Sequence, residues 1–92
     1  MKNVFKFKSK IWIWPGDYGW HFITLPKEIY TKIRKYYPKG FVKIEARINK
    51  TSWNTSLFPH KASGYLLCIN KKIRNKECLF VGDEIVVNLI IL

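Results

Sequence analysis

The feature that most constrains this chain's fold is a strand-to-helix corner that occurs twice. Residues 25–33, LPKEIYTKI, read as a strand end that runs into a helix, and residues 69–77, INKKIRNKE, repeat the pattern. Leu25 corresponds to Ile69 and Ile29 to Ile73, an offset of 44 in both cases. Each copy, about 19–48 and 63–90, is predicted as strand, helical corner, glycine and strand. One copy has too small an apolar face to fold alone, so two must enclose a shared core.

The helical part of each corner has recognisable ends. Pro26 suits a first helical turn because its fixed φ is already helical and its missing N–H would be unpaired there. Ile29, Ile33 and Tyr37 form one apolar stripe, and Pro38 and Gly40 end the pattern. A helix is therefore predicted over about 26–37 and a shorter one over about 70–78. With a second helix two residues shorter, the stretch Gly40–Ile44 is expected to correspond to Gly82–Val86.

Most of the remaining chain alternates with the period of a β-strand. In residues 5–14, Phe5, Phe7, Ser9, Ile11 and Ile13 are expected to point inward, and Lys6, Lys8, Lys10, Trp12 and Trp14 outward. In residues 42–48, Val42, Ile44, Ala46 and Ile48 are expected to point inward. Further strands are predicted over 20–25, 52–58, 65–69 and 83–92, with a tight turn near Asn49 and a loop over 59–64. The predicted fold is one mostly-β (small α+β) domain over 1–92, a pseudo-two-fold barrel of six to seven strands capped by the two helices.

Composition places the chain among small globular domains. Its 92 residues are 48% hydrophobic, which is enough apolar material for a core without disulfides. Two cysteines are too few for a disulfide framework, and the first ten residues lack the apolar segment of a signal peptide. The longest apolar run, 85–92, is less than half a membrane span. We expect a cytoplasmic monomer with no membrane association.

Net charge is the strongest compositional signal. The chain has 17 basic and 6 acidic residues, a formal charge of +11, and residues 1–50 carry most of the excess. A positive field of this size attracts polyanions such as nucleic acids. The same charge can also serve solubility alone, and the sequence leaves these two readings open.

Four motifs in order resemble one family: WPGDYGWHFITLPKEI, TSLFPHKASGYLL, KKIR and VGDEIVV. Over about residues 5–89 the chain is similar to the domain-of-unknown-function family numbered 1905, with Cys68 standing where that family more often has proline. The resemblance implies a small double-split β-barrel, similar to the swapped-hairpin barrel of transition-state regulators and antitoxins, with both halves in one chain. Those relatives build the barrel from two chains and bind DNA. The family itself implies no activity.

The candidate binding residues are basic side chains with one tryptophan. Lysines can neutralise phosphates as point charges, arginine can grip them with its planar fork, and an indole face can stack on a base. The alternative is that Trp12 and Trp14 lie beneath a helix and that the lysines protect an edge strand. Three further basic groups follow: one with Lys32 and Lys39 around the first helix, one on the next strand, and one with Lys71 at the second corner. The predicted contacts are Lys6, Lys8, Lys10, Trp12, Arg34, Lys35, Lys43, Arg47 and Arg74.

Catalytic and metal chemistry are not predicted. Cys68, Cys78, His21 and His60 lack the spacing of a zinc site. Ser56, His60 and Asp17 can be drawn as a triad on paper, but no nucleophile motif supports them. The sequence therefore predicts a non-catalytic module without cofactors that binds DNA or RNA without sequence specificity. The alternatives are a module that binds an acidic protein and a small-ligand barrel or enzyme with a pocket near His21, Trp53 and His60.

Overall fold

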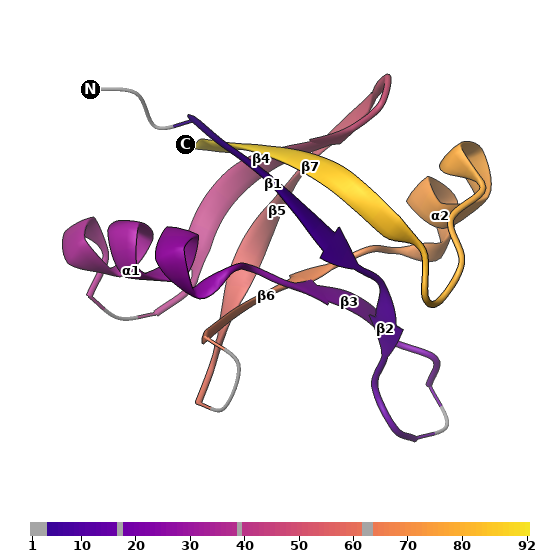
Figure 1. Cartoon of the computed structure of the whole chain (residues 1–92), viewed down its shortest axis with the longest axis horizontal. Helices are drawn as coiled ribbons and strands as arrows, with labels where there is room; N and C mark the ends of the chain where they lie inside the picture. Colours follow the sequence, from indigo (N-terminus) through magenta and orange to yellow (C-terminus); the bar gives the residue numbers. More distant parts are fainter. Residues whose placement is uncertain (1–3, 17, 39, 62–63) are drawn as a thin grey trace.

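The computed structural model describes residues 4–16, 18–38, 40–61 and 64–92. Within these residues the chain forms seven strands and two helices (Figure 1), so the mostly-β fold class is confirmed. The elements are β1 (Val4–Lys10), β2 (Trp12–Ile13), β3 (His21–Thr24), α1 (Lys27–Tyr36), β4 (Val42–Ile48), β5 (Thr51–His60), β6 (Gly64–Cys68), α2 (Lys71–Glu77) and β7 (Glu84–Ile91).

The strands form one antiparallel sheet that curls into a half-barrel. Their order is β1-β7-β4-β5-β6-β3-β2, and β5 joins the two halves because its first part pairs with β4 and its end pairs with β6. In Figure 1 the helices α1 and α2 lie at opposite sides of the curled sheet. The two edge strands, β1 and β2, are consecutive in the chain and are separated only by Ile11.

Ile11 marks the main difference from the predicted strand over 5–14. Its N–H donates to the carbonyl oxygen of Asp83 at 3.0 Å and its carbonyl accepts from Gly82 N–H at 2.8 Å, whereas Trp12 pairs with Phe22 on β3. The chain therefore leaves one edge of the sheet at Ile11 and joins the other. The buried Ile11 side chain, 1% exposed, fills the bend.

The core lies between the inner faces of the curled sheet. The inward positions predicted on β4 are confirmed, since Val42, Ile44, Ala46 and Ile48 are all buried, and Ile29, Ile33 and Ile73 add the helices to the same core. Two inward assignments are wrong. Ile13 is 44% exposed because it lies beyond the bend at Ile11, and Tyr37 is 38% exposed because it is the C-cap, where the backbone has already left the helix.

Strand β5 is longer than predicted. Pro59 and His60, expected in a loop, pair with Tyr65 and Gly64 of β6. Proline is tolerated there because β4 pairing ends at Leu57, so one side of β5 has no neighbour that needs the missing N–H. The expected tight turn after β4 is present, with Asn49 in the left-handed region at φ 54°.

Backbone hydrogen bonds relate the two halves by an approximate two-fold pattern. Leu25 N–H donates to Tyr65 O at 3.0 Å, and Ile69 N–H donates to His21 O at 2.9 Å, so both donors and both acceptors are 44 positions apart. Ile23 lies directly opposite Leu67, its own counterpart at that offset. The expected equivalence of Gly40–Ile44 with Gly82–Val86 is wrong by one residue, because buried Val42 would correspond to exposed Glu84. An offset of 43 matches buried Val42 to buried Ile85.

Candidate nucleic-acid interface

Five of the predicted contact residues share the outer face of the sheet formed by β1, β7, β4 and β5. We call this set the basic sheet face: Lys6, Lys8, Lys10, Lys43 and Arg47. All five side chains are exposed, because they occupy the outward positions of β1 and β4.

Strand register places these cations in a defined array. Lys6 lies opposite Asn88, Asn88 opposite Arg47, and Arg47 opposite Ser52, which makes one polar row across four strands. Neighbouring strands are about 4.8 Å apart, so Lys6 and Arg47 lie about 10 Å from each other across β7. An array of this kind can contact successive phosphates of one backbone.

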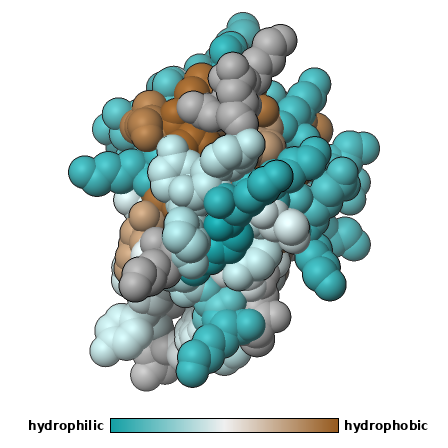
Figure 2. All heavy atoms as spheres, turned by 90° about the vertical axis from the view of Figure 1, so that its left-hand side faces the viewer, coloured by the Kyte–Doolittle hydropathy of each residue, from teal (hydrophilic) through white to brown (hydrophobic). Residues whose placement is uncertain are grey.

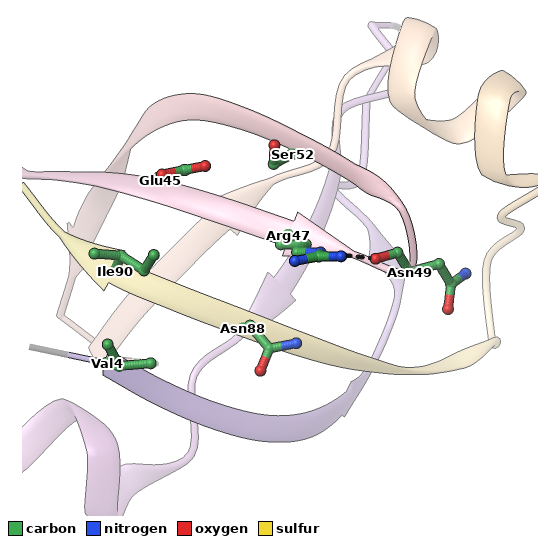
Figure 3. A pocket seen from close by; sticks show the side chains of 7 residues that line it. All are labelled: Val4, Glu45, Arg47, Asn49, Ser52, Asn88 and Ile90. Carbon is green, nitrogen blue, oxygen red and sulfur yellow. Dashed lines mark hydrogen bonds between the residues drawn. The ribbon is translucent and has the colours of Figure 1, made fainter.

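The face is hollowed beside Arg47 (Figure 3). This hollow of ≈ 460 Å³ is lined by residues that include Arg47, Ser52, Asn88, Val4 and Ile90. Arg47 Nε donates to the carbonyl oxygen of Asn49 at 3.0 Å, which holds the guanidinium over β4 and leaves its terminal nitrogens for other acceptors. Glu45 is the carboxylate among the residues that line the hollow.

The cations of this face lie beside two carboxylates but form no ion pair with them in the part of the chain that the structure describes. Glu84 lies directly opposite Lys10, and Glu45 lies on β4 between the two cations of that strand. The ion pair that does form there joins Lys32 Nζ and Glu28 Oε1 at 3.8 Å on α1, away from this face. The basic sheet face therefore carries five cations against two carboxylates.

One end of the molecule is less polar. Figure 2 shows the side that carries α1, where hydrophilic side chains spread over most of the surface and a hydrophobic area lies toward the top, near the ends of β1 and β7 in Figure 1. Val4, Ile90 and Leu92 are 52%, 41% and 61% exposed there. The basic sheet face therefore has an apolar margin beside the hollow.

The three remaining basic candidates lie on the helices, apart from the sheet face. Arg34 Nη1 donates to Tyr37 O at 2.9 Å, and its guanidinium lies 5.0 Å from the centre of the Tyr65 ring. Lys35 is exposed on the same helix. Lys39 lies outside the described residues.

Arg74 is held at the second corner by two interactions. Its Nε donates to Ile69 O at 3.1 Å, and its Nη1 lies 3.2 Å from Nε2 of His21. Nδ1 of His21 is 2.6 Å from Gly19 O, and the Arg74 guanidinium can only donate, so Nδ1 donates to Gly19 O and Nε2 accepts from Arg74. Arg34 and Arg74 thus have internal partners, and their phosphate contacts stay predictions.

A second surface, which the sequence reasoning missed, is aromatic. A hollow of ≈ 280 Å³ opens on the outer face of the other half of the sheet, and we call it the aromatic hollow. It is lined chiefly by Trp14, Trp20, Phe22, Phe58, His60 and Leu66. The available signal was that Trp14, Phe22 and Phe58 are aromatic residues in or beside strands. The sequence could not show that they come together, because that depends on the bend at Ile11 and on the pairing of β2, β3, β6 and β5.

The rings of the aromatic hollow support one another. Trp20 stacks on Phe22 with centroids 6.5 Å apart and planes at 13°, while Phe58 meets Phe22 edge-on at 6.2 Å. Trp14 meets the His60 ring edge-on at 5.5 Å. Such packed aromatic pairs are stabilising beyond the apolar area that they bury.

Trp12, the predicted base-stacking residue, is less accessible than Trp14 and Trp20. Its indole N–H donates to Thr24 Oγ1 at 3.0 Å, and its ring packs against Trp14 and Phe22. The expected cover for Trp12 and Trp14 was a helix, but the contacts of both rings are aromatic side chains from β2, β3 and β5. Trp12 supports the aromatic hollow from one side.

Among the described residues, side chains that could hold a metal or line the suggested pocket do not come together. No group of three or more His, Cys, Asp or Glu side chains there is placed to hold a metal ion. Burial raises the pKa of the half-buried Cys68 thiol, although Arg74 opposes this. The suggested pocket near His21, Trp53 and His60 does not form in this part of the chain: His60 lines the aromatic hollow, His21 lines a different one, and Trp53 packs against the core. The suggested triad partner Asp17 lies outside the described residues.

The fold and these surfaces define a small, basic, mostly-β module with a cationic sheet face beside an aromatic one. Residues 7–89 match the family model described as "Domain of unknown function (DUF1905)", and the chain belongs to that family. No curated protein matches the chain. In the residues that the structure describes, no helix is long and apolar enough to cross a membrane.

Proposed function

We propose that this protein is a non-catalytic module that binds nucleic acid through the basic sheet face. The observation that carries the proposal is the polar row from Lys6 through Asn88 to Arg47 and Ser52, set in register across four strands. Ligand phosphates would contact Lys6, Lys8, Lys10, Lys43 and Arg47. Because such contacts position a nucleic acid without reading its bases, binding through this face would be independent of sequence.

The charge balance of the whole chain supports this proposal. A formal charge of +11 steers a polyanion toward the molecule over a distance set by ionic strength. At the sheet face, none of the five cations forms an ion pair in the described residues, and they outnumber the two carboxylates there, Glu45 and Glu84. An anionic polymer would release its counterions on binding there.

The test is the salt dependence of binding to labelled duplex and single-stranded oligonucleotides. If four cations neutralise phosphates, the slope of log K against log salt should be about −3.6 for duplex. Lys6→Gln, Lys8→Gln and Arg47→Gln, made together, should weaken binding and reduce the slope by about 2.7. Lack of binding at 50 mM salt would reject the proposal.

A matched control distinguishes binding through the basic sheet face from binding by total charge. Lys27→Gln, Lys32→Gln and Lys72→Gln, made together, remove the same charge from the helices and should change the slope much less. Equal effects of the two triple variants would contradict a defined interface and indicate binding by net charge alone. Equally tight binding of polyglutamate would likewise reject nucleic acid as the preferred ligand.

A further inference from the structure

We propose that the aromatic hollow stacks unpaired bases, so that this protein binds single-stranded nucleic acid in preference to duplex. This inference rests on the proposed function and specifies its ligand. It assigns the phosphates to cations and the bases to Trp14, Trp20 and Phe58. Base stacking on aromatic side chains tolerates any sequence because every base has a π-face.

The rings of the hollow are open on one side and supported on the other. Trp14, Trp20 and Phe58 are 40%, 52% and 38% exposed, whereas Phe22 and Leu66 beneath them are only 8% and 3% exposed. The exposed rings therefore lie on buried side chains and are held in place by contacts with one another and with the Phe22 ring. A preorganised surface of this kind loses little side-chain freedom when a planar ligand stacks on it.

At one end, the aromatic hollow lies close to a cation of β4. Phe58 meets Phe41 at a centroid distance of 4.9 Å, and Phe41 precedes Lys43 by two positions, which puts both side chains on the outer face. Two residues along a strand span about 6.6 Å. Lys43 thus connects the aromatic hollow directly to the basic sheet face.

At the other end of the aromatic hollow, Trp20 lies next to further cations. Trp20 also lines a second hollow of ≈ 190 Å³, whose other residues include His21, Lys71 and Arg74. Arg74 Nη1 faces the acceptor nitrogen of His21 at 3.2 Å, so internal contacts hold the Arg74 guanidinium group beside this hollow. A ligand that crosses the aromatic hollow meets positive charge at both ends.

This arrangement matches a single strand better than a duplex or a peptide. The ligand must be anionic at intervals and must carry planar apolar groups between the charges. Duplex bases are stacked on one another and cannot lie on these rings. His60 supports the hollow from one side, because its ring meets that of Trp14 edge-on at 5.5 Å.

The test compares two single strands that have equal numbers of phosphates with a duplex of the same length, which carries about twice as many. A ten-residue oligothymidine, a ten-residue abasic backbone and a ten-base-pair duplex are titrated at one salt concentration, with tryptophan fluorescence and anisotropy as readouts. Oligothymidine should bind roughly 5- to 100-fold more tightly than the abasic strand and should quench tryptophan fluorescence.

The variant Trp14→Leu/Trp20→Leu keeps apolar bulk but removes two stacking faces. It should bring oligothymidine affinity most of the way down to that of the abasic strand, because Phe58 remains, and should leave duplex binding unchanged. Tyr36→Leu is the matched control, because Tyr36 is 58% exposed on α1 and lies outside the hollow. Phe58→Leu provides an independent variant if the double variant does not fold.

The outcomes distinguish this inference from the proposed function. Equal affinity for oligothymidine and abasic strand, with salt-dependent binding of both, would overturn base stacking and leave the basic sheet face in place. A loss of duplex binding in the leucine variants would also overturn it. Binding of a proline-rich peptide that is tighter than binding of oligothymidine would assign the hollow to a different partner and overturn it as well. Failure of every nucleic acid to bind would reject the proposed function itself.

Discussion

At the residue scale, the two arginines of the helices have internal partners that a charge count does not reveal. Arg34 and Arg74 were predicted to contact phosphate, yet each donates to a backbone carbonyl at a helical corner. The bond of Arg34 lies at the C-terminal end of α1, where carbonyl groups point outward and a cation is stabilising. The bond of Arg74 lies at the other end of its helix, because Ile69 precedes the first turn of α2. Sequence alone cannot separate these internal uses from an external one, because both favour a basic residue at a helical corner.

Gly64 is the residue whose backbone leaves least freedom for substitution. Its φ is +87°, and an added Cβ would lie 3.0 Å from Cδ1 of Tyr30. Tyr30 cannot easily move away, because its ring packs at 5.0 Å against the fully buried Tyr65. Gly64→Ala should therefore lower the free energy of unfolding by about 2 kcal/mol or more, measured by urea denaturation.

Gly82 provides the comparison for this prediction. Its φ is also positive, at +92°, but a Cβ there would meet nothing within 4 Å. Gly82→Ala should lower the free energy of unfolding by about 1 kcal/mol, because it introduces backbone strain without a steric contact. If the two variants were equally unstable, contact with Tyr30 would not be what restricts Gly64.

At the scale of secondary-structure elements, the sequence predicted most strands and both helices within a few residues. Alternation in 42–48 and the proline before α1 were local signals that the packed structure preserves. The bend at Ile11 was not predictable, because the side chains alternate through it without interruption. Lys10 points outward, Ile11 inward and Trp12 outward whether the strand is straight or changes partner.

The same reason explains why the candidate site was only partly predicted. Lys6, Lys8 and Lys10 share a face through their own strand, and Lys43 and Arg47 share one through theirs. That these two sets adjoin depends on β7 lying between β1 and β4, which is a long-range pairing. The aromatic hollow depends in the same way on three strands from separate parts of the chain.

Helix α2 is fastened to the β4–β5 hairpin by one carboxylate. Glu77 accepts hydrogen bonds from the Thr51 hydroxyl and from Asn49 Nδ2, the latter at 2.9 Å. These bonds, first that of Thr51 and then that of Asn49, hold the pKa of Glu77 below its ordinary value. The carboxylate thus favours the folded state only while it is ionised.

The pH dependence follows from that direction. Because the folded pKa lies below the unfolded one, the stabilisation is complete above the unfolded value, about 4.3, and is lost as pH falls through the folded value. Glu77→Gln should lower the urea midpoint at pH 7, and its difference from the parent protein should shrink below pH 4. The exposed Glu84→Gln is the control. A difference that stays constant from pH 7 to pH 3 would contradict this role of Glu77.

At the scale of the whole molecule, the curl of the sheet gives its outer surface two chemically distinct parts. The outward side chains of the part built from β1, β7, β4 and β5 are mostly polar or charged, and aromatic side chains cover the part built from β2, β3 and β6 with the end of β5. Strand β5 carries outward residues of both parts, from Ser52 beside Arg47 to Phe58 and His60. The molecule therefore presents charge and stacking surface together without a dedicated recognition helix.

The pairing of β1 with β7 brings the beginning and the end of the fold together. Val4 lies directly opposite Ile90, and Figure 1 shows the start of β1 and the end of β7 at the same side of the sheet. A short glycine–serine connection between them, with the chain reopened between β5 and β6, should give a circular permutant that unfolds cooperatively and keeps the parent's circular dichroism spectrum. An unfolded permutant would show that the native connection between β5 and β6 is needed for assembly. If the permutant folds, the architecture does not depend on which of the two similar halves comes first in the chain.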